Sequence, residues 1–345
     1  MTTIYDVARR AQVSAATVSR VTNGIASVDV QLAARVQKAM RELGYSPNAV
    51  ARNLRRSRTS LWAVIISDVE NPFFTALVRG VEDVAQQAGY SVVLCNSDED
   101  PAKEAQYVSV AMAEQMAGVI LSPSGKSKRL DQLISSGMAV VTVDRELRGA
   151  GLDAALVDNE HGARVGTSHL LDAGYKRLAC IAGPLKASTA TERLRGFREA
   201  LRVRDLPVID ELVCRGDFRE QGGYKAMETL LDRPSPPDGV FVANNLMTIG
   251  AVECLVDRGV SIPDSIGVVG FDDIPWAHLV RPSLTTVTQP TYELGRTAAT
   301  LLERRISDPS RPPSRIVLRT ELQIRGSSQR SPISPRVVAA KQHRP

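Results

Sequence analysis

Short apolar runs alternate with amphipathic helical stretches through most of this chain, and this alternation constrains its fold more than any other feature. Runs that are apolar on both faces are typical of parallel strands whose sheet is covered by helices on each side. Seven such units exceed what one small sheet holds, and the alternation restarts near Asp158. The pattern predicts an α/β body of two Rossmann-like subdomains with a cleft between them. The expected strands are 61–66, 91–95, 118–121, 139–143, 178–181, 239–242 and 266–269.

Polar residues follow several of these strands. Open parallel sheets bind ligands beyond the carboxyl ends of their strands, so these residues should lie together along that edge of the sheets. Carboxylate, amide and guanidinium groups beside aromatic faces suit a sugar, because each sugar hydroxyl both donates and accepts hydrogen bonds. Taken singly, each residue could instead be a turn cap or a buried structural group, and their shared location favours a binding site. The candidates are Asp68, Asp144, Arg145, Arg193, Asn244 and Asp272, with Phe73, Phe74 and Phe218 as the aromatic faces.

Positive charge is concentrated at the start of the chain. Residues 1–60 contain ten Lys and Arg against three Asp and Glu, a formal charge of +7, whereas the whole chain carries +5. Lysine and arginine release counterions from phosphates, so this distribution indicates a nucleic-acid-binding module attached to a nearly neutral body. A solvated basic face would have the same charge. The sequence pattern within residues 1–60 has to decide between such a face and a nucleic-acid-binding module.

That local pattern predicts three short helices. The first begins at Ile4, and Ser14 caps a second from Ala15 to about Val21, so the two form a helix-turn-helix. Asp29 caps a third helix that ends at Gly44. In this arrangement the start of the second helix meets base edges in a major groove, where Arg20 can reach a guanine. Val7, Ala8, Val13, Val18 and Val21 should face inward, and Ala15, Ala16, Ser19 and Arg20 outward.

A fourth helix is expected after Pro47, because Ser46 fits its N-cap and Pro47 its first position. At about nine residues it is shorter than the ~12–15 that an isolated helix needs in water. It should therefore form only against a partner helix or DNA.

The chain resembles the LacI/GalR family of transcriptional regulators. Five stretches carry the resemblance: IYDVARRA at 4–11, VSAATVSRVTN at 13–23, LGYSPNAVAR at 43–52, NPFF at 71–74 and GVVGFDD at 267–273. It implies a helix-turn-helix headpiece and a body of the periplasmic-binding-protein type I fold. The function it implies is that of a DNA-binding repressor whose operator affinity is controlled by a small-molecule effector in the cleft. Because the polar and aromatic candidates suit a sugar, we expect this effector to be a carbohydrate, and we expect the protein to be a homodimer.

The resemblance also assigns roles to individual residues. Ala15, Ala16 and Arg20 would read bases, Thr17, Ser19 and Asn23 would contact phosphates or position the helix, and Leu54 would be a minor-groove wedge, with Asn48 in the same hinge helix. Effector contacts would come from Phe73, Asp144, Arg193, Phe218, Asn244 and Asp272. Two positions depart from the family pattern: Gln12 replaces the usual turn glycine, and Asn245 replaces an aspartate.

The expected domain organisation follows from these patterns. On the family's architecture, Leu284 to Val287 and the chain near Leu318 are crossovers between the subdomains. The last residues carry basic groups, Ser and Pro, which predicts a disordered tail. The expected parts are a headpiece at 1–46, a hinge helix and linker at 47–60, an effector-binding and dimerisation domain at 61–325 with an N-subdomain at about 61–159 and 291–318 and a C-subdomain at about 160–288 and 319–325, and a tail at 326–345.

Other classes of function fit less well. A transport solute-binding protein would explain the cleft, yet the first ten residues carry charge where an export signal needs an apolar core. A Rossmann-type enzyme would explain the alternation, yet Gly125-Lys126-Ser127 lacks the earlier glycine of a phosphate loop, because Ile120 stands there. We expect a cytoplasmic protein with no catalytic site, no metal and no cofactor. No C-terminal leucine heptad is visible, so a dimer is expected rather than a tetramer.

Overall fold

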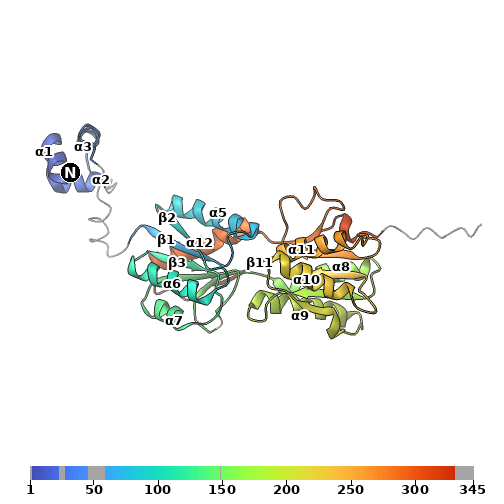
Figure 1. The fold of residues 1–345 in the computed structure, drawn as a ribbon. Coiled ribbons are helices and arrows are strands. Elements are labelled where there is room, and N and C mark those ends of the chain that lie inside the picture. The colour runs from blue at the N-terminus through green and yellow to red at the C-terminus, as the bar shows by residue number, and fades with distance from the viewer. Residues whose placement is uncertain (1, 23–27, 46–58, 148, 331–345) are drawn as a thin grey trace, which may run out of the picture. The chain divides into compact units, whose positions relative to one another are not determined.

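The computed structural model describes residues 2–22, 28–45, 59–147 and 149–330 (Figure 1). They belong to two compact units, Met1–Thr59 and Ser60–Pro345.

The described residues of the first unit form three helices, α1 (Ile4–Ala11), α2 (Ala15–Thr22) and α3 (Val30–Glu42). Each has a side-chain cap at its start. Thr3 and Asp6 form a reciprocal capping box on α1, the Ser14 hydroxyl accepts from the Thr17 amide at 3.1 Å, and Asp29 caps α3. The predicted caps of the second and third helices are confirmed.

A small core holds these helices together. Val7, Val18 and Val36 are fully buried, one from each helix. Val13 and Val21, expected inside, are half-buried and pack against this core. The prediction that Ala15 faces outward is wrong in part, because Ala15 is half-buried and packs on the same core.

Gln12 forms the turn between the first two helices in a left-handed conformation, with φ 53° and ψ 49°. Its amide donates to the carbonyls of Ala8 and Arg9. The Arg35 guanidinium reaches from α3 and donates to the carbonyls of Ala11 at 2.5 Å and Gln12 at 3.2 Å. Gln12, which replaces the usual glycine, therefore keeps the left-handed turn. The cost is steric, because its side chain crowds the backbone in the left-handed conformation.

Two six-stranded sheets form the second unit, and we call each sheet with its helices a lobe. The strand order of lobe 1 is β11-β5-β4-β3-β1-β2, and all its pairings are parallel. The strands are β1 (Leu61–Ile66), β2 (Ser91–Asn96), β3 (Gly118–Leu121), β4 (Ala139–Val143), β5 (Asp153–Val157) and β11 (Arg315–Leu318). The helices are α5 (Pro72–Gln87), α6 (Pro101–Ala113), α7 (Lys128–Ser135) and α12 (Thr291–Ser307).

Lobe 2 repeats this design with the order β12-β10-β9-β8-β6-β7, in which β10 and β12 are antiparallel. Its strands are β6 (Leu178–Ala182), β7 (Val213–Arg215), β8 (Gly239–Val242), β9 (Gly267–Phe271), β10 (Thr285–Thr288) and β12 (Glu321–Gln323). Its helices are α8 (Asn159–Asp172), α9 (Ser188–Val203), α10 (Glu220–Leu231), α11 (Asn245–Asp257) and the 3-10 turns η1 (Asp210–Leu212) and η2 (Gly326–Ser328).

Helices cover both faces of each sheet (Figure 1). Successive residues of β1 show this in lobe 1. Trp62, Val64 and Ile66 join the core under α5 and α12, whereas Ala63 and Ile65 join the core under α6 and α7. The apolar runs of the sequence therefore mark strands buried on both faces, as expected.

Three short connections join the lobes: Asp158, Gln289-Pro290 and Arg319-Thr320. The prediction that Leu284 to Val287 is a crossover is wrong, because Thr285–Thr288 is β10 and pairs with β9 and β12. Residues 326–330, expected in the disordered tail, are packed as well. Ser327 and Ser328 are fully buried, and Ser328 bonds the Thr285 hydroxyl at 2.7 Å. Residues 331–345 lie outside the described part of the chain.

The turn geometry at Gln12 gives a test of headpiece stability. Gln12→Gly should stabilise the headpiece by about 0.5–1 kcal/mol, because glycine adopts positive φ without the steric cost and this gain exceeds its added unfolded-state entropy. Gln37→Gly, at an exposed site inside α3, should destabilise it by about 1 kcal/mol. Amide exchange of α1 and α3 in the full-length protein measures both. Faster exchange in Gln12→Gly would contradict the strain assignment.

Candidate functional site

One pocket in the second unit brings together all six residues expected to contact an effector. It is lined from both lobes, and its empty space, including the part open to solvent, is about 460 Å³. Asp68, Phe74 and Arg145, also expected along that edge of the sheets, line it too. The six are Phe73, Asp144, Arg193, Phe218, Asn244 and Asp272. Sequence reasoning did not select the other lining residues, Asn71, Glu99, Thr189, Asp217, Arg219 and Gln289.

The parallel sheets place these side chains, because their strands end at the pocket. Asp144 follows β4 and Asp272 follows β9. Asn244 follows β8 and caps α11 by accepting from the Met247 amide at 3.0 Å. Asn71 caps α5 in the same way, accepting from the Phe73 amide at 3.0 Å. Strand ends and helix starts therefore fix the positions of the pocket residues.

Several pocket residues hold a left-handed backbone without being glycine. Asp144, Phe218 and Asp272 have φ of 66°, 68° and 71°, and Glu99 has 59°. Each such conformation costs roughly 1–2 kcal/mol for a residue with a side chain. Strain of this kind is typical of binding and catalytic sites, where the surrounding structure imposes the conformation.

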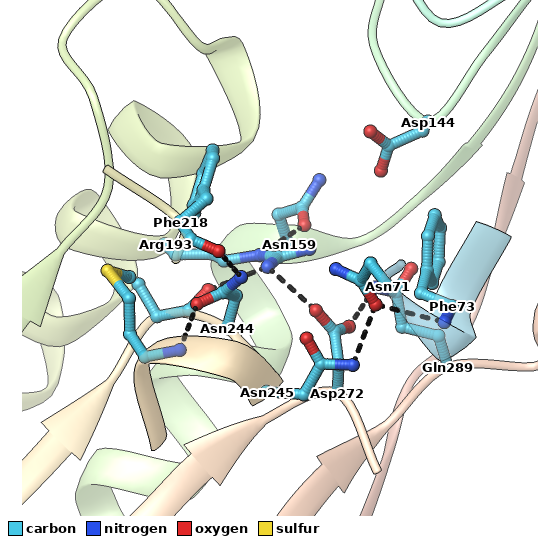
Figure 2. Close-up of polar contacts among 12 residues, drawn as sticks. Asn71, Phe73, Asp144, Asn159, Arg193, Phe218, Asn244, Asn245, Asp272 and Gln289 are labelled. Atoms are coloured by element: carbon cyan, nitrogen blue, oxygen red, sulfur yellow. Dashed lines mark hydrogen bonds and ion pairs between the residues drawn. The ribbon is translucent and has the colours of Figure 1, made fainter. Parts of the chain in front are cut away.

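Arg193 is the centre of a buried network in lobe 2 (Figure 2). Its Nε donates to Asn159 Oδ1 at 2.9 Å, and its Nη1 donates to the Ala243 carbonyl at 2.7 Å and to Asp272 Oδ2 at 3.3 Å. The guanidinium also lies 3.7 Å from the ring centre of Phe271. Gln289 Nε2 donates to the other Asp272 oxygen. Burial raises the pKa of Asp272, and Arg193 and Gln289 offset part of that rise.

Asn245 links the two lobes. Its Nδ2 donates to Asn71 Oδ1 at 2.8 Å, and both residues are buried. An aspartate at position 245 would place a carboxylate against an oxygen that already accepts from the Phe73 amide. The departure from the family pattern therefore supplies a donor that this contact requires.

Arg219 links the lobes at the edge of the pocket. It lies in lobe 2, and its guanidinium is 3.7 Å from Asp68, 3.9 Å from Glu70 and 3.9 Å from Asp98, all in lobe 1. Its side chain is 42% exposed, so each ion pair is weak.

Asp144 is a buried carboxylate with poor internal partners. The Ser122 hydroxyl lies 3.4 Å from its Oδ2, and Arg145 Nε lies 3.5 Å from the same oxygen. Burial raises the pKa of Asp144 to about 6, against the attraction of Arg145 and Arg193. A ligand hydroxyl that donates to this carboxylate would supply a missing partner.

Buried Arg145 pairs with half-buried Glu99. Arg145 Nη1 donates to Glu99 Oε2 at 2.7 Å, and Nη2 donates to Oε1. The guanidinium also lies 5.8 Å from the ring centre of Phe218 in the other lobe. Burial opposes the charge of Arg145, but the hydrogen bond and charge of Glu99 outweigh it, so the pKa of Arg145 is raised.

The headpiece residues expected to contact DNA differ in their exposure to solvent. Ala16 and Arg20 are exposed on α2, and Ala15, Thr17 and Ser19 are half-buried. The Thr17 hydroxyl is 2.9 Å from that of Ser14, so it also belongs to the helix cap. Asn23, Asn48 and Leu54 lie outside the described residues.

The described residues contain neither a candidate metal cluster nor a helix that could cross a membrane. Within ranges 2–22, 28–45, 59–147 and 149–330, no group of three His, Cys, Asp or Glu could hold a metal ion. In that same part of the chain, no helix is both long and apolar enough to span a bilayer.

The raised pKa of Asp144 predicts a pH-dependent effect on stability. Its folded pKa of about 6 exceeds the ordinary 3.8, so this carboxyl lowers the stability of the folded state progressively as pH rises from 3.8 to about 6, and by a constant amount above that. Asp144→Asn should therefore raise the free energy of unfolding at pH 7 by roughly 1–3 kcal/mol, and by less at pH 5. Denaturant unfolding at both pH values measures this, with exposed Asp131→Asn as the control. A variant less stable than wild type at pH 7 would contradict the assignment.

Two descriptions of known families match the chain. Residues 3–48 match bacterial regulatory proteins of the lacI family, and residues 167–328 match a periplasmic binding protein-like domain. The ribose operon repressor of Escherichia coli K12 is 36% identical over 330 residues, which cover 95% of this chain and 100% of the relative.

Solved structures are also similar to this chain over nearly its full length. A transcriptional regulator CelR–cellobiose complex matches with a TM-score of 0.73 and 33% identity, covering 95% of this chain and 100% of that one. The lac repressor dimer bound to operator and the anti-inducer ONPF matches with a TM-score of 0.83 and 27% identity, covering 95% and 99%. The chain therefore belongs to the lacI family of bacterial regulatory proteins.

Proposed function

We propose that this DNA-binding transcriptional regulator is a repressor whose effector is an uncharged monosaccharide held in the pocket between the lobes. One observation carries the proposal. Among the described residues, the pocket lining includes a buried donor without a hydrogen-bond partner, Arg145 Nε, and a buried acceptor without one, Gln289 Oε1. A sugar hydroxyl both donates and accepts, so one class of ligand satisfies both atoms. The proposed role is binding without turnover.

The charge of the pocket favours a neutral ligand. Its lining holds five carboxylates and three guanidinium groups, a formal excess of two negative charges. Each guanidinium already faces a carboxylate, Arg145 with Glu99, Arg193 with Asp272 and Arg219 with Asp68. An anionic ligand would meet this excess in a buried site, where charge repulsion is strong. The carboxylates are Asp68, Glu99, Asp144, Asp217 and Asp272.

Aromatic rings supply apolar faces for the carbon skeleton of a sugar. Phe73 and Phe74 in lobe 1 pack edge to face at 5.0 Å, and Phe218 lines the pocket from lobe 2. Because the E. coli relative is named for a ribose operon, ribose is the first effector to test.

Effector binding would act on DNA binding through the two lobes. A ligand that contacts both lobes shifts the populations of their arrangements only by as much as its affinity differs between those arrangements. We further propose that the protein works as a homodimer, since the lac repressor relative is a dimer on its operator. By linkage, effector and operator must change each other's affinity by the same factor.

A first test concerns the effector. Calorimetry on the full-length protein with ribose, other aldopentoses and aldohexoses should identify a ligand. Asp272→Ala should then weaken its binding by about 1–3 kcal/mol, because the Arg193 network loses a charged partner. Asp131→Ala, at an exposed site of α7, should bind as wild type does. Equal affinity of Asp272→Ala and wild type would place the site elsewhere.

A second test concerns operator recognition. Arg20→Ala should lose about 1–3 kcal/mol of operator binding and relax selectivity at one base pair, because a guanine contact is lost. Arg41→Ala removes the same charge from α3 instead of α2, and should weaken binding without relaxing selectivity. Selection of oligonucleotides at fixed salt distinguishes the two effects. Unchanged selectivity in Arg20→Ala would reject the docking of α2 in the groove.

A further inference from the structure

We propose that Glu99 is the specificity-determining residue that keeps anionic sugars out of the pocket, by occupying the guanidinium fork of Arg145. The inference rests on the proposed function, since it concerns the effector of the same pocket. It extends that proposal by naming one residue, outside the set expected from the sequence, that sets the charge class of the ligand.

Glu99 lies in a loop that lines the pocket. It follows β2, and its amide donates to the Ser67 carbonyl at the end of β1, at 3.1 Å. Its neighbour Asp98 shares its left-handed backbone, with φ of 54°. The carboxylate is 31% exposed, whereas Arg145 is 6% exposed. Glu99 is thus the more accessible member of the pair and can be changed with less disturbance to the core.

The contacts of Arg145 determine what it can offer a ligand. Both of its Nη groups donate to the two oxygens of Glu99. Within the described residues, its Nε is buried without a hydrogen-bond partner. Arginine binds carboxylates and phosphates through a pair of parallel N–H groups, and here Glu99 already occupies such a pair. The remaining Nε–H suits a single hydroxyl oxygen.

The other two guanidinium groups of the pocket are held differently. Arg193 is tied to Asn159, the Ala243 carbonyl and Asp272, and Asp272 is itself a proposed effector contact. Arg219 lies at the exposed edge. Removing the partner of either would alter the binding network or the contact between lobes. Glu99 is the acidic partner that can be neutralised while both of those networks keep their members.

Two further carboxylates face Arg145 and will remain in any Glu99 variant. Asp144 Oδ2 lies 3.5 Å from Arg145 Nε, and buried Glu104 lies near enough to attract it. Glu104 is engaged by the Ser124 amide at 2.7 Å. Neutralising Glu99 therefore frees the fork of Arg145 without leaving the guanidinium as an isolated buried charge.

The test compares neutral and anionic forms of one sugar. Full-length wild type, Glu99→Gln and Glu99→Asp are titrated by calorimetry with ribose, ribonate and ribose 5-phosphate, and with glucose, gluconate and glucose 6-phosphate. Glu82→Gln, at an exposed site of α5, controls for the loss of one charge. Thermal unfolding checks that each variant is folded, and Glu99→Ala replaces Glu99→Gln if the latter is not.

The expected result is a change in selectivity. In Glu99→Gln the ratio of anionic to neutral sugar affinity should rise at least tenfold, while Glu99→Asp and Glu82→Gln keep the wild-type ratio. An unchanged ratio in a folded Glu99→Gln that still binds the neutral sugar would overturn this inference and leave the proposed function standing. A wild type that binds the anionic form more tightly would instead overturn the proposed effector class, and the inference with it.

Discussion

The buried guanidinium of Arg193 is the interaction on which the arrangement of the pocket depends. It joins the start of α8 through Asn159, the end of β8 through the Ala243 carbonyl and the end of β9 through Asp272. Asp272 in turn holds Gln289, in a connection between the lobes. A buried charge is tolerated only when paired and hydrogen bonded, so these segments must keep their positions for Arg193 to remain inside. The same requirement fixes the positions of these polar groups at the pocket.

Two residues proposed to contact the effector reduce the stability of the unliganded body. Asp144 and Asp272 combine a strained backbone with a carboxylate whose pKa is raised by burial. Both features disfavour the folded state and neither improves packing. A ligand that donates to Asp144 relieves part of this cost, so binding and folding of the body are coupled. Relief of this cost is a physical reason why a ligand that fills the pocket would change the stability of the body.

Sequence reasoning located the strand ends well, since long apolar runs mark strands and parallel strands end on one side. It therefore predicted that Asp144, Asn244 and Asp272 lie close together, and all three line one pocket. It missed Glu99, whose pairing with Arg145 depends on a loop conformation that no local pattern encodes. It also read β10 as a crossover, because a four-residue strand of Thr and Val resembles a connector. Ala15 was misjudged because helical position alone cannot show how closely α1 and α3 approach it.

Polar contacts join the lobes in the region of the pocket. Asn245 and Asn71 share one neutral hydrogen bond, and Arg219 makes partly exposed ion pairs with Asp68, Glu70 and Asp98. Such contacts contribute on the order of 1 kcal/mol each. A ligand that bridges the lobes then needs only a few kcal/mol of preference to change their populations. Strong apolar packing in this region would lock the lobes together. The amide at position 245 and the guanidinium at position 219 instead give specific contacts that a bound ligand can outweigh.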